Sequence, residues 1–186
     1  MSATPEPLRI TCVSSDCDKD LHCFRPTAKM AEAERGRCRT CGADLIDWER
    51  VHKRDLSDLE NTFSALDKEM FRNHMLHLPI PQRLVDLGLK QGPEVLKQRT
   101  ARAVRSALSK PRSENSWDGR QTPRDGSDGA RIQHYAQHAT ATCCRVCLEY
   151  WHDIPADDRL SDQQMAFCVA IAWHFVDERL GPFDIT

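Results

Sequence analysis

The sequence lacks any apolar run of the length that a membrane requires. Its longest such run, within 167–176, is interrupted by His174 and is far shorter than the ~20 residues that cross a bilayer. The first ten residues contain two prolines and a glutamate but no apolar core of signal-peptide length. We therefore predict a cytoplasmic protein that has no membrane contact.

Familiar catalytic motifs are also missing. The sequence has no Gly-rich phosphate-binding loop, no ordered Ser-His-Asp set and no His-Glu-x-x-His motif of zinc proteases. No internal repeat is visible either. The sequence alone therefore does not establish whether the protein is an enzyme.

Cysteine, by contrast, is abundant: the chain of 186 residues has nine. Thiols in the cytoplasm are kept reduced and disulfides are rare there, so we expect metal binding to be the main use of these side chains. The alternative is that they are buried thiols that pack as small apolar groups. Zinc is the ion that sets of thiolates and imidazoles hold in small structural sites.

The N-terminal cysteines have the spacing of a zinc ribbon, Cys12-x4-Cys17-x5-Cys23-x14-Cys38-x2-Cys41. A close pair of cysteines on a tight turn supplies two corners of a tetrahedron, and the glycine after Cys41 permits that turn. We predict one structural zinc site that is formed by Cys12, Cys17, Cys38 and Cys41. Cys23 and His22 are the alternative ligands.

The remaining sequence has mainly helical patterns. Apolar residues at spacings of three and four predict helices over 55–78, 82–89 and 93–108, and Ser161 and Gln164 form a capping box before a last helix that ends at Gly181. Residues 132–151 are helical in character but are interrupted at 139–142. The predicted fold class is mainly α with a small zinc-ribbon-like N-terminal module, and the predicted domains are a ribbon over 8–50, a helical segment over 55–110 and a Cys/His-containing helical domain over 111–182.

A second concentration of metal-ligand types follows the pattern Cys144-x2-Cys147-x4-His152, with His138 upstream. Two thiolates and two imidazoles are a common zinc environment. We therefore predict a second zinc site with these four ligands. Cys143 is an alternative to Cys144, and His134 is an alternative to His138. The competing interpretation is that the cysteines pack in a core and that His152 lies in a solvated turn.

At these residues the sequence resembles an uncharacterised bacterial domain family. The resemblance rests on Asp-Gly-x-Gln-Thr-Pro at 118–123, on Gln-His-Ala-Thr-Ala-Thr-Cys-Cys-Arg-x-Cys-Leu at 137–148 and on Trp-His-x-Ile-Pro at 151–155, and it begins loosely near residue 84. The chain departs from the family at 131–134, where Arg-Ile-Gln-His stands in place of His-Pro-Val. The family has no assigned activity. The resemblance implies that the segments around 121 and 138–152 belong to one site.

Such a site would combine hydroxyls, an amide and a guanidinium beside a metal, which suits phosphate recognition or a metal-activated water. The candidate contacts to a substrate or a phosphate are Asp118, Gln121, Thr122, Thr140, Thr142 and Arg145.

Charge along the chain is uneven, with 11 Lys/Arg against 6 Asp/Glu over 82–131 and 2 against 8 over 149–186. The basic middle favours contact with a phosphate backbone, so we predict a zinc-binding protein that associates with nucleic acid through Lys97, Arg99, Arg102 and Arg105. One alternative is a metal-dependent hydrolase or nuclease that uses the Cys144, Cys147 and His152 site. The other is a zinc-stapled module that binds a protein partner or forms a homodimer through its C-terminal helix.

Overall fold

The computed structural model describes residues 10–115, 117–119, 122, 130–181 and 183, and within these ranges the chain is mainly helical. The helices are α1 (Trp48–His52), α2 (Leu59–Leu66), α3 (Met70–His77), α4 (Gln82–Gln91), α5 (Pro93–Leu108), α6 (Ile132–Ala139), α7 (Arg145–His152) and α8 (Asp162–Leu180). Short 3-10 turns lie at Cys17–Lys19, Glu32–Glu34, Leu56–Asp58 and Arg112–Glu114. The described residues form no β-strand, only two isolated bridges. These findings confirm the mainly α fold class.

Local signals set the ends of the two longest helices. Pro93 occupies the first turn of α5, where its missing N–H costs nothing. At α8 the hydroxyl of Ser161 accepts a hydrogen bond from the Gln164 backbone N–H at 3.1 Å, and the Gln164 side chain accepts one from the Ser161 N–H at 2.8 Å. The capping box that the sequence predicts is therefore present. None of the described helices has both the length and the apolar character needed to cross a bilayer.

The prediction of a single helix over 55–78 is wrong, because the chain bends out of helical geometry between α2 and α3. Glu69 has an extended backbone, with φ −88° and ψ 122°. The His22 N–H donates to the Lys68 carbonyl and the Met70 N–H donates to the His22 carbonyl, each at 2.8 Å. The N-terminal segment thus bridges the gap between the two helices, a long-range contact that helical periodicity does not reveal.

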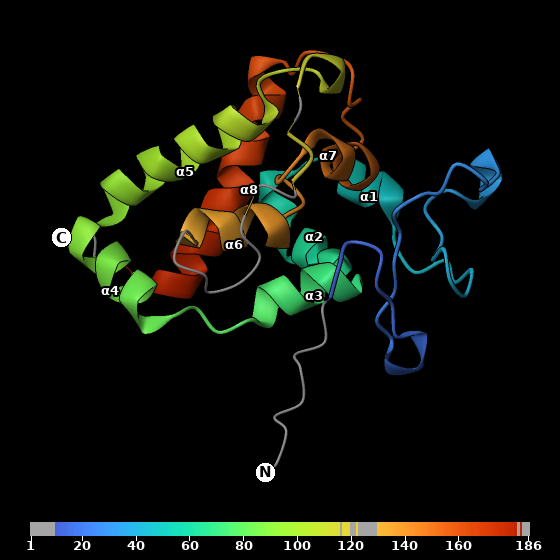
Figure 1. The fold of residues 1–186 in the computed structure, drawn as a ribbon, viewed down its shortest axis with the longest axis horizontal. Coiled ribbons are helices and arrows are strands. Elements are labelled where there is room, and N and C mark those ends of the chain that lie inside the picture. Colours follow the sequence, from blue (N-terminus) through green and yellow to red (C-terminus); the bar gives the residue numbers. More distant parts are fainter. Residues whose placement is uncertain (1–9, 116, 120–121, 123–129, 182, 184–186) are drawn as a thin grey trace, which may run out of the picture.

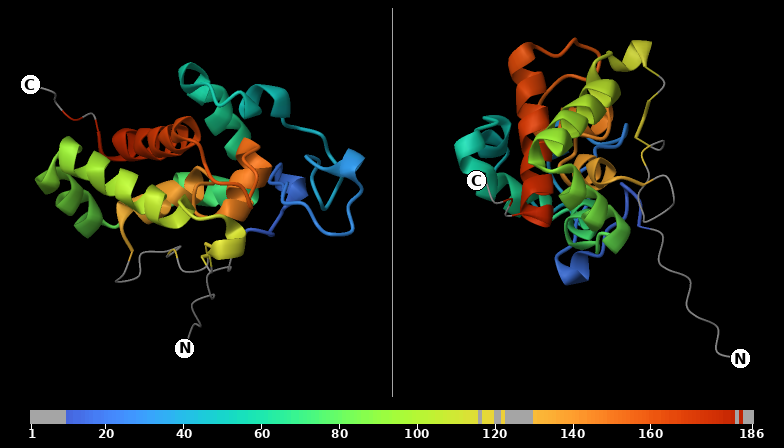
Figure 2. Two further views of the ribbon diagram at one scale, coloured as in Figure 1. Left: turned by 90° about the horizontal axis from the view of Figure 1, so that it is seen from above. Right: turned by 90° about the vertical axis from the view of Figure 1, so that its left-hand side faces the viewer.

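The helices form a compact body around α8, which packs against α5 and α6, while α3 packs against α6 and α4 against α5 (Figure 1). The N-terminal segment up to α1, drawn in blue, lies at the end of this body that is remote from α4 (Figures 1 and 2). α7 contacts α1 at that same end. The two cysteine-rich parts of the sequence are therefore near each other.

One apolar core runs through the N-terminal segment and the helices. Phe24 is almost fully buried, and its ring makes edge-to-face contacts with Trp48 at 5.9 Å and with Trp151 of α7 at 6.0 Å between centroids. Trp48 and Trp151 also contact each other at 5.2 Å. These rings join the N-terminal segment to α7. The predicted domain boundaries at 8–50, 55–110 and 111–182 stay a prediction.

Candidate metal centres

Four potential ligands meet in the N-terminal segment, and we call them the loop cluster: Cys17, His22, Cys38 and Cys41. One ligand atom from each lies within 4.8 Å of all the others. Cys17 begins a 3-10 turn, whereas Cys38 and Cys41 flank a tight turn in which the Gly42 N–H donates to the Cys38 carbonyl at 2.8 Å. Gly42 has a φ of +78°, the left-handed conformation that glycine adopts without strain.

The spacing of these atoms matches a tetrahedral metal site. With metal–sulfur bonds of ~2.3 Å, two thiolates at corners of a tetrahedron lie about 3.8 Å apart. The Sγ atoms of Cys17 and Cys38 are separated by 3.8 Å, and the Cys41 Sγ is 3.4 Å from Nδ1 of His22. The loop cluster therefore has the dimensions of a site with three sulfur ligands and one nitrogen ligand.

His22 is held in the orientation that a metal ligand needs. Its Nε2 lies 3.0 Å from Oδ1 of Asp20, while Nδ1 faces Cys41. Asp20 in turn accepts from the Lys68 ammonium at 2.5 Å, and this hydrogen bond, followed by the one to His22, lowers the pKa of Asp20. A carboxylate behind a histidine fixes the tautomer that presents the other nitrogen to a metal.

The thiols of the loop cluster differ in proton affinity. Burial raises the pKa of Cys38, but backbone hydrogen bonds at Cys23, Cys41 and Thr40 outweigh it and bring the pKa to about 6. For Cys17, burial together with hydrogen bonds to Cys41 and Cys38 raises the pKa to about 12. Cys38 is thus a thiolate at neutral pH, and thiolates are the form that binds metals.

Two other cysteines of this segment lie outside the loop cluster. The sequence predicts Cys12 as a ligand of this site, but Cys12 lies beside Cys147 of α7. His22, one of the two alternative ligands, is the fourth member of the loop cluster instead. Cys23 is fully buried, and its Sγ donates to the Cys12 carbonyl at 3.6 Å. Cys23 therefore packs in the core, beside the cluster but not as a member of it.

A second group of thiols, which we call the helix cluster, consists of Cys143, Cys144 and Cys147. Their Sγ atoms lie within 4.8 Å of one another, and all three residues are buried. Cys144 occupies the N-cap position of α7, and Cys147 lies in the first turn of that helix. The Cys144-x2-Cys147 pair that the sequence predicts is thus brought together, with Cys143 beside Cys144 and not in its place.

The thiol of Cys12 lies beside this group, although it is not within 4.8 Å of all three of the group's sulfurs. Its side chain interacts with Cys147, and Cys12 lines one cavity of about 620 Å³ together with Cys143, Cys144 and Cys147. Hydrogen bonds from Cys12, Cys143 and Cys144 lower the pKa of Cys147 well below its ordinary value. Hydrogen bonds to Cys144 and Cys147 raise the pKa of Cys143 well above the ordinary value of a cysteine thiol. These contacts favour the thiolate form, and hence a negative charge, at Cys147.

A buried cation faces that charge. The guanidinium of Arg72 on α3 donates to the Cys147 Sγ at 3.0 Å and to Oε2 of Glu69 at 3.0 Å, and both Arg72 and Glu69 are almost completely inaccessible to solvent. Trp151 Nε1 also donates to Glu69 at 2.8 Å. Burial raises the pKa of Glu69, and Arg72 and Trp151 oppose that rise. The sequence does not reveal this pair, because the i,i+3 spacing of Glu69 and Arg72 is also that of an ordinary ion pair on a helix surface.

The two histidines predicted as ligands of the second site are not members of the helix cluster. Nε2 of His138 lies 3.0 Å from the Thr122 carbonyl, and Nε2 of His152 lies 2.8 Å from the Thr140 carbonyl. Both rings are buried, and burial lowers the pKa of His152 to about 4. His152 therefore serves as a neutral core side chain, while His138 lines the cavity beside the thiols.

The described residues of the 118–123 motif, Asp118, Gly119 and Thr122, lie near the helix cluster, as the resemblance implies. Asp118 and Gly119 line the cavity, and a Cβ atom on Gly119 would come within 3.3 Å of the Cys144 Sγ. Thr122 is buried beside His138. Gln121, also predicted as a contact, lies outside the described residues.

The other predicted polar contacts have structural partners. Thr140 donates to the Ala136 carbonyl at 2.7 Å and lies 3.0 Å from the Thr142 hydroxyl, and both threonines are fully buried. Arg145, also buried, donates to the carbonyls of Leu108, Pro155 and Asp158 at 3.0, 2.6 and 2.5 Å. Its guanidinium fixes the loop after α7, and Arg145 also lines the cavity of the helix cluster. These hydrogen bonds give all three residues a structural role.

The predicted interaction surfaces differ in exposure. All four basic residues of α5 that the sequence suggests, Lys97, Arg99, Arg102 and Arg105, are exposed. On α8, Phe175 is buried in the core, and Trp173 is half-buried with its ring stacked on Phe183. The basic helix is thus available to a partner, whereas the aromatic pair of α8 is largely used within the protein.

A model of a protein family described as a domain of unknown function (DUF4186) matches residues 60–177, more than half of the chain. The match includes α3 and the helix cluster but not the loop cluster. No solved structure matches this chain.

Proposed function

We propose that the chain, which belongs to the DUF4186 family of domains of unknown function, is a zinc-binding protein with two metal centres. One observation carries the proposal: the 3.8 Å between the sulfurs of Cys17 and Cys38, in a group of four ligand atoms that are mutually within 4.8 Å. In the first centre Cys17, Cys38, Cys41 and Nδ1 of His22 hold the ion. The carboxylate of Asp20 behind His22 supports this ligand set.

The second centre has four thiolates, from Cys12, Cys143, Cys144 and Cys147. A divalent ion with four thiolates carries a net charge of −2, which is costly to bury without cations nearby. Arg72 lies 3.0 Å from the Cys147 sulfur, and Arg25 lines the same cavity. These two cations are the compensation that such a centre requires. Cys12 replaces the histidines that the sequence suggested.

Both centres would be structural. Four protein ligands leave no coordination position for a water molecule, so neither centre would hydrolyse a substrate. The second centre would instead tie residue 12 to α7 and fix the N-terminal segment on the helical body. A hydrolase or nuclease would need an open position at Cys144 and Cys147. A homodimer or protein partner through α8 stays a prediction from the sequence.

Metal analysis of purified protein tests this function. We expect two zinc ions per chain in the wild type and one in each of Cys38→Ser, Cys144→Ser and Cys12→Ser. Cys168→Ser is the matched control, because Cys168 is a buried thiol of α8 outside both clusters, and it should retain two. One ion in the wild type, or two ions in Cys12→Ser, would contradict the two-centre assignment.

Cobalt substitution distinguishes structural from catalytic centres. The thiolate-to-cobalt absorption should report seven sulfur ligands in the doubly loaded protein, four in Cys38→Ser and three in Cys144→Ser. Both sites should be tetrahedral and should not change on addition of a small anion such as cyanate. An exchangeable water on the cobalt at the helix cluster would instead favour the hydrolase.

A second function, association with nucleic acid, is favoured by the exposure of the four cations on α5. Basic side chains on one helix neutralise backbone phosphates and make binding depend steeply on salt. We expect retention of the protein on single- and double-stranded DNA at low ionic strength and its loss on adding salt. Binding that is absent at low salt, or unchanged in a variant with all four cations replaced by glutamine, would exclude this function.

A further inference from the structure

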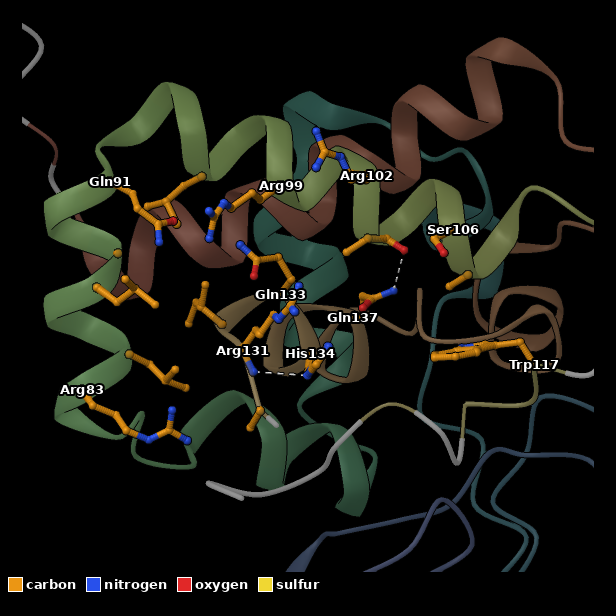
Figure 3. A pocket seen from close by; sticks show the side chains of 18 residues that line it. Arg83, Gln91, Arg99, Arg102, Ser106, Trp117, Arg131, Gln133, His134 and Gln137 are labelled. Carbon is orange, nitrogen blue, oxygen red and sulfur yellow. Dashed lines mark hydrogen bonds between the residues drawn. The ribbon is translucent and has the colours of Figure 1, made fainter. Parts of the chain in front are cut away.

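A cavity of about 710 Å³ opens between α4, α5 and the start of α6, away from both cysteine clusters (Figure 3). Its volume lies within the range of pockets that bind small molecules, roughly 300–1,000 Å³. Its lining combines basic and amide-bearing side chains with the buried apolar side chains of Leu84 and Leu96. None of its described lining residues is a proposed metal ligand, although Trp117 also lines the cavity of the helix cluster and donates to the Cys143 carbonyl at 3.1 Å.

Four arginines from three elements line the cavity: Arg83, Arg99, Arg102 and Arg131. Not one of its described lining residues is Asp or Glu. Arginines on a protein surface are ordinarily interspersed with acidic residues, so the guanidiniums of Arg99, Arg102 and Arg131, with no acid among the described lining residues, give this concave site a positive potential. The cavity therefore favours an anion of more than one charge.

One amide of the cavity lining has a donor without a hydrogen-bond partner among the described residues. Gln133 on α6 is 5% exposed, and its Nε2 atom is buried with no hydrogen-bond partner among the described residues. Leaving such a donor unpaired costs free energy, so a native structure that keeps one usually satisfies it with a water, an ion or a ligand. Figure 3 shows Gln133 between Arg99 and Arg131, in the middle of the cavity.

The neighbouring polar groups are already ordered. Nδ1 of His134 accepts from the Arg131 backbone N–H at 3.2 Å, and Nε2 of Gln137 donates to the Ala103 carbonyl at 3.3 Å. Burial, with Arg131 nearby, lowers the pKa of His134 to about 4, so its ring is neutral at pH 7. His134 and Gln137 thus help to hold the wall, and the remaining donors are the guanidiniums of Arg99, Arg102 and Arg131 and the buried amide of Gln133.

We propose that this cavity binds a phosphate-bearing small molecule of nucleotide size. Guanidinium groups recognise phosphate by paired, charge-assisted hydrogen bonds, and Arg99, Arg102 and Arg131 suit a ligand with at least one phosphate group. Trp117 lines the end of the cavity remote from Arg83 (Figure 3), and an aromatic ring in a cavity wall suits a flat group such as a nucleobase. The phosphate would lie against Arg99 and Arg102.

The position of the α5 cations separates this proposal from surface binding of nucleic acid. Arg99 and Arg102 line the cavity, whereas Lys97 and Arg105 of the same helix do not. A ligand inside the cavity should depend on the first pair alone. A long polyanion that lies along the helix should depend on both pairs. The second pair is therefore a matched control with the same number of charges.

Calorimetric titration with inorganic phosphate, with single ribonucleoside mono- and triphosphates and with a twelve-nucleotide single strand tests the proposal. At physiological salt we expect at least one nucleotide to bind more tightly than inorganic phosphate does. Arg99→Gln and Arg102→Gln should each weaken it about tenfold, as expected for loss of a charge-assisted contact. The Lys97→Gln/Arg105→Gln double variant should change binding less than about twofold, because exposed charges outside the cavity are screened.

Gln133→Met gives a second readout that a merely structural role would not produce. Methionine has nearly the same shape but no donor, so the variant should lose ligand affinity while its thermal stability stays equal or rises. Failure of every nucleotide to bind more tightly than phosphate would overturn the proposal. Equal losses in Arg99→Gln, in Arg102→Gln and in the Lys97→Gln/Arg105→Gln double variant, or binding of the oligonucleotide alone, would also overturn it and would leave the metal centres unaffected.

Discussion

The loop cluster and the helix cluster gather similar ligands by opposite means. The loop cluster draws all of its ligands from residues 17–41, in turns, and Cys41 is exposed. The helix cluster lies at the start of α7, and its three thiols are buried. Its proposed fourth ligand, the half-buried Cys12, comes from the N-terminal segment. A site built from one short segment is set largely by local turns. A site built from distant segments depends on the packing of the whole fold.

The two clusters are nevertheless connected through Glu69. The backbone on either side of Glu69 is hydrogen-bonded to His22, a loop-cluster residue, and its carboxylate binds Arg72, whose guanidinium reaches Cys147 of the helix cluster. The break between α2 and α3 is therefore the place where the two centres meet. Experiments that separate them should perturb one ligand environment and leave this connection intact.

The largest expected difference between the two clusters is in the rate at which a chelator removes their metal. We expect a chelator to strip the loop centre about a thousandfold faster than the helix centre, because opening a buried element costs several kcal/mol more than opening an exposed loop and each 1.4 kcal/mol is a factor of ten. A colorimetric chelator should give two phases of metal release. Cys38→Ser should retain only the slow phase and Cys144→Ser only the fast one. A single phase in the wild type would mean that the centres open together.

Removing the buried cation should destabilise the whole fold. Arg72→Met leaves the Glu69 carboxylate and the helix cluster without their counter-charge, and breaking a buried ion pair costs about 3–5 kcal/mol of unfolding free energy. Urea unfolding followed by circular dichroism measures this loss. The control is Arg50→Met, which breaks a bidentate but exposed ion pair with Asp58 and should change the unfolding free energy little. Equal effects of the two substitutions would show that Arg72 is not compensating buried charge.

The same contrast explains what the sequence could predict. α5 and α8 begin where Pro93 and Ser161 indicate, because caps act within a few residues. The pairs Cys38-x2-Cys41 and Cys144-x2-Cys147 are likewise local, and the structure brings each of them together. The partners of those pairs lie far along the chain, and cysteine spacing cannot say that residue 12 meets residue 147. The break at Glu69 was missed for the same reason, since it depends on His22.

Changing the residue behind His22 should weaken the loop centre alone. Asp20→Asn removes the charge that orients His22, and loss of such a partner lowers metal affinity by about ten- to a hundredfold, the lower value being expected for an exposed carboxylate. Competition with a chelator of known affinity measures the effect. Asp16→Asn is the control, because Asp16 pairs with Lys19 on the surface and contacts no ligand side chain. An equal loss at the helix centre would indicate a general change in folding.

The smallest expected effect compares two glycines. Gly42 and Gly119 have φ of +78° and +84°, so alanine is strained at both, by about 1–2 kcal/mol. A Cβ on Gly42 meets nothing within 4 Å, whereas one on Gly119 lies 3.3 Å from the Cβ and Sγ of Cys144. Gly119→Ala should therefore lower the unfolding free energy by roughly 1 kcal/mol more than Gly42→Ala does. This value is the lower end of the cost of adding a methyl group to a packed core. That excess should appear as weaker metal binding at the helix centre only, because the thiol that must move belongs to it. If both alanines lower the unfolding free energy equally and neither centre loses metal affinity, the Asp118–Gly119 segment does not pack tightly against the thiols. The packing that distinguishes the helix cluster from the loop cluster would then lie elsewhere.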